Sequence, residues 1–257
     1  MNSRFLFKPG VYLVLAIYIA LAYSVLAMGN NLLAVAVPED HYFEIVGASA
    51  LFATSFLFLY GLKLARKLLD GTRMSLVKRL VYLGLALLFF VGAGEEISWG
   101  QRMLGFVTPE AISQVNKQEE FNLHNLTVWE ASRYLDADRL FDLFWFSFCV
   151  LMPAMALVAP SFRRWASQFI PIVHWGISLL FLYNYLWAKL AKLLFGGAYT
   201  FDRIPFAQAL QEIKESNYAI IFILVGLFAI QDLQMSRAAH RSSLKGGSIK
   251  IEPVFHD

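Results

Sequence analysis

Charged residues are scarce in this sequence, and their scarcity excludes an ordinary water-soluble domain. Asp, Glu, Lys and Arg make up 16% of the 257 residues, against roughly 25% in soluble domains. Apolar residues account for 58% and aromatic residues for 16%, and the mean hydropathy is +0.54. Because a surface that faces water on all sides cannot be built from this composition, we expect an integral membrane protein.

Cysteine is nearly absent as well. The only one, Cys149, lies in an apolar run, which excludes an intramolecular disulfide framework and favours a small buried side chain. The formal net charge is only +3, so nucleic acid is not expected as a partner. The partner that this composition requires is the lipid bilayer.

Long uncharged runs predict an all-α bundle of six transmembrane helices. An apolar helix of about 20 residues crosses the hydrocarbon core of a bilayer. Runs near this length predict spans at residues 11–29, 42–62, 80–94, 143–160, 169–187 and 218–231. We expect one domain over residues 1–236, with a long structured loop between the third and fourth spans, and a basic tail at 237–257.

The first run has an alternative interpretation as a secretory signal peptide. Arg4 and Lys8 precede it, and Ala34-Val35-Ala36 resembles a cleavage site. The run is longer than the usual apolar region of about 7 to 15 residues in such peptides, which favours a membrane span.

Basic residues predict the orientation of the spans, because Lys and Arg gather on the cytoplasmic side. They follow the second, fourth and sixth spans, at Lys63, Arg66, Lys67, Arg73, Lys78, Arg79, Arg163, Arg164, Arg237, Arg241, Lys245 and Lys250. Acidic residues dominate the connections after the first and third spans. We therefore expect both termini in the cytoplasm and the long loop on the outer side.

The end of the third span carries the most informative motif, Gly94-Glu95-Glu96-Ile97-Ser98-Trp99-Gly100-Gln101-Arg102. The uncharged run before it extends for only about 22 Å, short of a hydrocarbon core of roughly 30 Å. Both carboxylates should therefore lie near the apolar boundary, where a cation, a metal or a raised pKa must offset their charge. On a continuing helix, Ser98, Trp99 and Arg102 share the face of Glu95, and Glu96 points elsewhere.

This motif also has a purely structural interpretation. Glu95 could pair with Arg102 while Glu96 faces interfacial water, so that a salt bridge merely ends the helix.

Residues 116–126 combine amides, acids and His124 on the same outer side. We expect this segment to fold back over the helix ends and His124 to act as a general base or a metal ligand. Imidazole and carboxylates together suit zinc, iron or manganese, so Glu95, Glu96 and His124 are candidate catalytic residues and ligands of a divalent metal ion. A lone loop histidine is, however, commonly solvated or structural.

Further candidates surround this motif. Glu44 begins the second span, where it could join the outer acids or simply favour the first turn of a helix. His174 shares a face of the fifth span with Ser178, Tyr185, Lys189 and Lys192, which could line a groove or anchor the span at the interface. The predicted substrate-binding residues are Glu44, Ser98, Trp99, Gln101, Arg102, Asn125 and His174.

The segment 94–102, together with Thr108-Pro109-Glu110 and Asn122-Leu123-His124-Asn125-Leu126, resembles an uncharacterised family of bacterial polytopic membrane proteins. The resemblance implies a bacterial inner-membrane location and supports the choice of residues, and it implies no activity. Ceramidase-like membrane hydrolases share the acidic start of a span, but their His-x-x-x-His pair is missing around His174.

Three functions are compatible with these patterns. The leading hypothesis is a membrane enzyme, such as a metal-dependent hydrolase or transferase, that acts on a lipid or lipid-linked head group. The alternatives are a proton-coupled transporter or channel and a non-catalytic subunit of a membrane complex. The sequence shows no inverted repeat of the kind common in transporters, which weakens the first alternative.

Overall fold

The computed structural model describes residues 9–28, 36, 41–68, 73–128, 137–196 and 206–245. Within these ranges the regular secondary structure is helical. The described residues form no strand and one isolated β-bridge, between Asn116 and Leu126. Its elements are α1 (Pro9–Ser24), η2 (Val25–Ala27), α3 (Tyr42–Leu68), α4 (Arg73–Glu96), η3 (Ser98–Gly100), α5 (Gln101–Leu104), α6 (Glu110–Ser113), α7 (Ala137–Phe146), η5 (Ser147–Leu151), α8 (Met152–Val158), α9 (Pro160–Ala166), α10 (Trp175–Phe195) and α11 (Phe206–Lys245).

Within the described residues, six helical segments are long and apolar enough to cross a membrane, which confirms the predicted all-α polytopic bundle. They are Pro9–Ala27, Tyr42–Ala65, Leu76–Glu96, Ala137–Val158, Trp175–Phe195 and Phe206–Met235. Large apolar side chains cover much of their outer surface, including Leu13, Phe56, Leu87 and Leu186. Such a surface is suited to contact with lipid tails.

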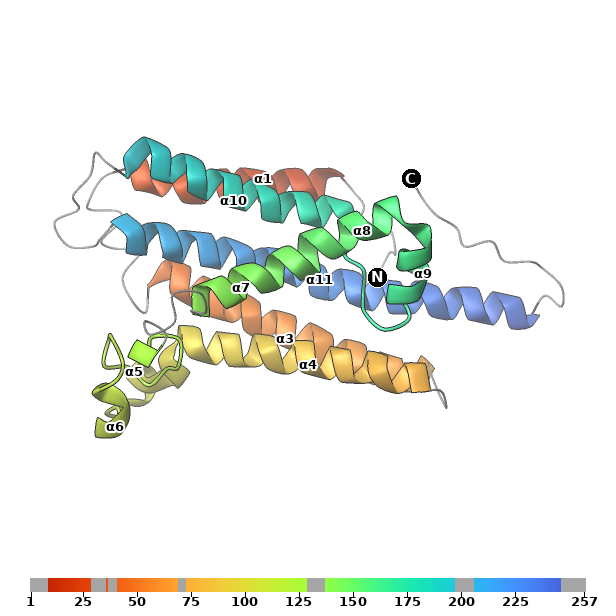
Figure 1. The fold of residues 1–257 in the computed structure, drawn as a ribbon, viewed down its shortest axis with the longest axis horizontal. Helices are drawn as coiled ribbons and strands as arrows, with labels where there is room; N and C mark the ends of the chain where they lie inside the picture. The colour runs from red at the N-terminus through yellow and green to blue at the C-terminus, as the bar shows by residue number, and fades with distance from the viewer. Residues whose placement is uncertain are drawn as a thin grey trace.

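The bundle is arranged around α11, the most buried span (Figure 1). Helices α3 and α4 lie side by side along one flank of α11, and α1 and α10 pair along the other. α7, the π-helical turn η5 and α8 form a bent helix that crosses the bundle obliquely. α5 and α6 lie beside the last turn of α4, at what we call the α6 end, and α9 lies at the opposite, α9 end (Figure 1).

Aromatic rings fill the centre of the bundle. Phe222 of α11 has its ring centroid 4.8 Å from that of Phe89 on α4 and 4.9 Å from that of Phe181 on α10. Tyr218, one turn earlier, stacks on Trp145 of α7 with centroids 4.9 Å apart. These edge and offset contacts fix how four helices meet inside the bundle.

The third span is longer than predicted, and the expected shortfall does not exist. α4 has 24 residues, about 36 Å of helix. It includes Lys78, whose buried Nζ donates to the Ser167 carbonyl oxygen at 3.1 Å and lies 3.7 Å from Asp232 Oδ2. Because Lys78 finds partners inside the protein, the helix starts earlier than an uncharged run suggests, and Glu95 and Glu96 are its last two residues.

The fifth span begins later than predicted, at Trp175 rather than near residue 169. Residues 171–174 are non-helical, in keeping with Pro171, which lacks a backbone donor and disfavours helix just before it. His174 therefore precedes the span instead of lying near its middle. Lys189 and Lys192 fall inside the helix, where long stems let their ammonium groups reach polar surroundings.

The sixth span also starts earlier than predicted. α11 begins at Phe206, so Glu212 and Glu215 belong to the helix rather than preceding it. It continues to Lys245, past residue 237 where the tail was predicted to begin. Residues 246–257 of that tail lie outside the described residues.

Candidate functional site

The chain leaves α4 through a turn with unusual backbone geometry. Ser98, Trp99 and Gly100 all have positive φ angles, of 45°, 54° and 75°. Only glycine adopts this region without steric cost, and strained non-glycine residues often mark functional sites. The helix ends at Glu96, so the predicted common helical face of Glu95, Ser98 and Arg102 is wrong.

The turn folds Trp99 back over α4. A Cβ atom on Gly94 would come within 2.9 Å of the Trp99 ring, so only glycine allows this close approach. Trp99 Nε1 donates to Glu95 Oε1 at 2.7 Å. The Trp99 indole therefore holds one oxygen of the Glu95 carboxylate.

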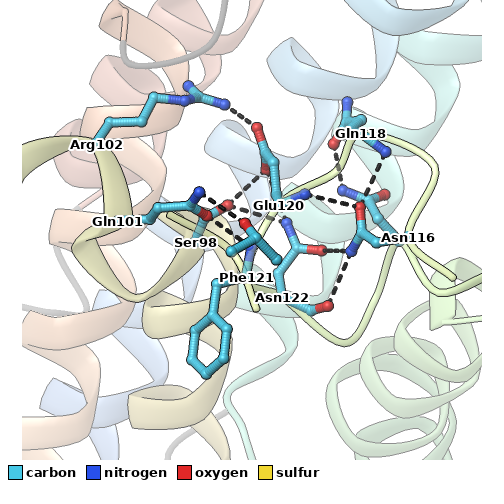
Figure 2. A network of polar contacts seen from close by, with 10 residues as sticks. Ser98, Gln101, Arg102, Asn116, Gln118, Glu120, Phe121 and Asn122 are labelled. Atoms are coloured by element: carbon cyan, nitrogen blue, oxygen red, sulfur yellow. Dashed lines mark hydrogen bonds and ion pairs between the residues drawn. The ribbon is translucent and has the colours of Figure 1, made fainter. Parts of the chain in front are cut away.

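Residues 98–127, which we call the polar loop, are built around Glu120 (Figure 2). Ser98 Oγ donates to Glu120 Oε2 at 2.5 Å, and Asn122 Nδ2 donates to the same oxygen at 2.9 Å. The other oxygen, Oε1, forms an ion pair with Arg102 Nη2. The buried Glu120 carboxylate thus ties the start of the loop, at Ser98 and Arg102, to its later segment at Asn122. Glu120 was not among the predicted site residues.

Two amides complete the polar loop (Figure 2). Asn116 Oδ1 accepts from the backbone N–H of Gln118 at 2.9 Å and of Glu120 at 3.2 Å. Gln101 Oε1 accepts from the backbone N–H of Phe121 at 2.7 Å, while its Nε2 donates to Thr108 Oγ1 at 2.7 Å. Because side chains satisfy these backbone groups, the non-helical part of the loop holds a defined shape.

Asn125 is part of the same framework. Its Nδ2 donates to Gln118 Oε1 and its carbonyl oxygen accepts from the Lys117 N–H at 2.9 Å. These bonds occupy the Asn125 amide within the loop, so the structure gives it a structural role beside its predicted substrate-binding role.

The polar loop brings His124 onto Glu95. Glu95 Oε2 accepts from the backbone N–H of Leu123 at 2.6 Å and of His124 at 3.0 Å. The same oxygen lies 3.5 Å from His124 Nδ1. The Glu95 side chain is 13% exposed and that of His124 is 40% exposed, so a sheltered carboxylate orients an accessible imidazole.

These contacts differ from the salt bridge that the structural interpretation assumed. That interpretation paired Glu95 with Arg102; the structure pairs Arg102 with Glu120 and joins Glu95 to Trp99 and the 123–124 backbone. Glu95 and His124, which lie 29 positions apart, meet, and their catalytic role stays a prediction.

Glu96 belongs to a second group of acids. Its charge interacts with those of Glu215 and Glu212 on α11, Glu44 on α3 and Asp138 on α7. We call these five residues the acid cluster. Glu44 is buried, and Glu215 also interacts with His124 and Lys214. The acid cluster and the Glu95–His124 pair therefore both lie at the α6 end, close enough for the charges of Glu215 and His124 to interact.

Glu212, Glu215 and Asp138 were not among the predicted site residues. These acids lie within or beside apolar runs, and that position could have marked them as candidates. Ionisable residues inside spans commonly face protein or water. Carboxylates gathered where water is limited repel one another, and a bound proton or cation relieves that repulsion.

The predicted metal site finds no support in this geometry. In the part of the chain that the structure describes, no group of three or more His, Cys, Asp or Glu side chains is placed to hold a metal ion. Glu95 and His124 meet, but Glu96 turns toward α11 instead of completing a ligand set with them.

His174 lies at the α9 end, at the start of α10, a helix about 30 Å long. Its Nδ1 caps α10 by accepting from the Gly176 N–H at 3.2 Å, and it lies 3.1 Å from Tyr12 Oη. Burial, with a smaller effect of the Arg163 charge, lowers the pKa of His174. His174 therefore caps α10 at the end of the bundle opposite the Glu95–His124 pair, and its substrate-binding role stays a prediction.

Comparison with protein-family models, curated proteins and solved structures gives no significant match. The resemblance to a bacterial membrane-protein family therefore stays a prediction.

Proposed function

We propose that this chain is a membrane enzyme that hydrolyses or transfers a bond in the head group of a lipid or lipid-linked substrate. One observation carries the proposal. A carboxylate–imidazole pair, Glu95 Oε2 with His124 Nδ1 at 3.5 Å, lies at the end of a membrane span and is fixed by two backbone hydrogen bonds. Such pairs are the usual means of preparing a histidine for proton transfer.

In this mechanism His124 is the general base and Glu95 orients it. With a proton on Nδ1 directed at the Glu95 carboxylate, Nε2 is left to accept a proton from water or from a substrate hydroxyl. The oxygen of that water or hydroxyl then attacks the phosphorus or carbonyl carbon of the substrate. His124 returns the proton to the oxygen of the leaving group as its bond to the substrate breaks. Glu95 stabilises the positive charge that His124 carries between these steps.

The remaining motif residues position this pair. Trp99 holds the second oxygen of Glu95, and Gln101 and Arg102 hold the polar loop through Phe121 and Glu120. We assign them to positioning the loop, because each bonds the loop or Glu95 directly.

We further propose a bacterial inner-membrane location with the α6 end outward and both termini in the cytoplasm. Lys63, Arg79, Arg163 and Arg164 lie in or beside the parts of α3, α4 and α9 that form the α9 end, and the positive-inside bias places this end in the cytoplasm. The Glu95–His124 pair then faces outer head groups.

The test uses the full chain reconstituted into vesicles of bacterial total lipid extract, with head-group release followed by mass spectrometry. His124→Asn and Glu95→Gln should each lower turnover by about two orders of magnitude or more. Glu110→Gln, an exposed acid on α6, is the matched control and should behave as wild type. Wild-type protein without any lipid turnover, or variants with full turnover, would overturn the proposal.

The acid cluster favours a second candidate function, proton-coupled transport. Glu44, Glu96 and Glu215 come from three different spans and interact through their charges, an arrangement suited to taking up and releasing a proton. Vesicles loaded with a pH-sensitive dye would test it. Flux equal to that of protein-free vesicles, or unaltered in Glu96→Gln and Glu215→Gln, would exclude transport through this cluster.

A further inference from the structure

A cavity of about 260 Å³ lies between α10 and α11 at the α6 end, outside the polar loop. Its polar lining includes Lys189 and Lys192 of α10, Lys214 and Gln211 of α11, and Asp142 of α7. Helices α10 and α11 have their ends together at this end of the bundle (Figure 1). The cavity therefore lies where a membrane surface would meet the protein.

The cavity has a positive charge balance. Three ammonium groups face one carboxylate, Asp142, whose Oδ1 already accepts from Trp145 Nε1 at 2.8 Å. Lys214 also interacts with the charge of Glu215, so Lys189 and Lys192 supply most of the excess. An anion in this cavity would meet two or three ammonium donors, whereas the Gln211 amide already donates to Glu215 Oε1.

Lysines near the end of a span commonly reach individually toward the head-group region, and that would explain Lys189 alone. It does not explain a shared cavity. Lys189 and Lys192 are one turn apart on α10 and meet Lys214 of a different helix across a hollow. Lys189 Nζ is moreover held 5.1 Å from the ring centroid of Tyr185, which also lines the cavity, so a neighbouring side chain positions it.

The other part of the lining is apolar. Ala188, Phe206, Ala207 and Leu210 contribute to it. The combination of an ammonium group and an apolar wall matches a molecule with a charged head and a hydrocarbon part. A free inorganic anion would use only the charged half.

We propose that this cavity binds a phosphate group, with the monoanionic phosphodiester of a phospholipid as its main source and free phosphate as the other. Lys189, Lys192 and Lys214 hold the phosphate oxygens, and Phe206 and Leu210 contact the start of the hydrocarbon chain. The inference does not depend on the proposed enzyme, because a lipid at this site would serve a transporter or a structural subunit equally.

The experiment measures binding by the purified full-length chain in detergent. Native mass spectrometry counts retained phosphatidylglycerol against phosphatidylcholine, and the melting temperature is followed with added inorganic phosphate. The variants are Lys189→Gln/Lys192→Gln, the charge-conserving Lys189→Arg/Lys192→Arg, and Lys214→Gln. Lys63→Gln, an exposed lysine near the α9 end of α3, is the matched control.

Wild type should retain phosphatidylglycerol in preference to phosphatidylcholine, and the double Gln variant should bind it about thirtyfold more weakly. The Arg pair and Lys63→Gln should bind as wild type, and Lys214→Gln should lose affinity less. A phosphate-induced melting shift that is lost in the double variant, with lipid binding unchanged, supports the site with free phosphate as its source. The proposal is overturned if wild type, the double Gln variant and Lys214→Gln all bind phosphatidylglycerol equally and all bind inorganic phosphate equally.

Discussion

Arg102 and Glu120 form an ion pair that closes the polar loop over the end of α4. The Glu120 carboxylate also accepts from Ser98 and Asn122, so three donors from two parts of the loop depend on it. Loss of a carboxylate that several donors share costs more than loss of a single hydrogen bond, since each donor is then left without its acceptor.

Glu120→Ala should open the polar loop without unfolding the bundle. Arg102, Ser98 and Asn122 would lose their common acceptor, so amide exchange at Gln118 and Phe121 should accelerate about tenfold or more. Hydrogen–deuterium exchange with mass spectrometry measures this. Glu110→Ala on α6 is the control, and equal exchange in the two variants would show that Glu120 does not hold the loop.

Glu95→Ala should release the loop locally at Leu123 and His124. Both backbone N–H groups donate to Glu95 Oε2, so their exchange should accelerate, while that of Gln118, held by Asn116, should change little. Trp99→Phe removes only the indole donor to Oε1 and should leave both amides protected. Uniform acceleration across the loop in Glu95→Ala would contradict the local role of this carboxylate.

Gly94→Ala should destabilise the protein by about 1–3 kcal/mol, the usual cost of overpacking. The added Cβ would lie 2.9 Å from the Trp99 ring and displace the indole from Glu95. Gly84→Ala on the same helix is the matched control, because a Cβ there meets nothing within 4 Å; it should be neutral or slightly stabilising. Thermal unfolding in detergent compares the two, and equal melting temperatures would contradict the close Gly94–Trp99 packing.

Stability should fall as the pH drops below the ordinary histidine range, because of His174. Burial lowers the pKa of His174 in the folded protein, so the unfolded chain binds a proton at higher pH than the folded one. The unfolded state then takes up more protons over the interval between the two values, and the free energy of unfolding rises with pH there. Above about pH 6.5 neutral His174 makes its full contribution to the free energy of unfolding. This contribution is lost as the pH falls through the lowered pKa of His174 in the folded protein.

Melting temperatures between pH 5 and pH 8 measure this effect. His174→Asn keeps a residue able to cap α10 but does not titrate, so its melting temperature should depend less on pH. An identical pH profile in wild type and His174→Asn would contradict the role of this histidine.

The position of the spans was predictable to the extent that charge marks their ends. The second span was predicted to begin at residue 42, where α3 begins. The third and sixth were predicted too short because Arg79, Lys78, Glu212 and Glu215 were placed outside them. Each of these side chains has partners inside the protein, and hydropathy cannot register a partner that lies far away in the sequence.

The site was predictable only in part. The motif at 94–102 and the segment around His124 were selected correctly as neighbours, since both flank the same long connection. Asn116 and Glu120 were missed because their importance lies in which backbone groups they bind. The positive φ angles of Ser98 and Trp99 could not be foreseen from residues that ordinarily avoid that region.

The sequence by itself determined that this is a bundle of six apolar helices, because the need to satisfy backbone groups in lipid leaves long apolar runs almost no other structure. Only the tertiary structure decided where the two adjacent acids go: Glu95 to the polar loop and His124, Glu96 to Glu215 on α11. Successive residues of a helix point in directions about 100° apart, so neighbours in sequence face different surroundings. Which surroundings those are depends on how distant helices pack.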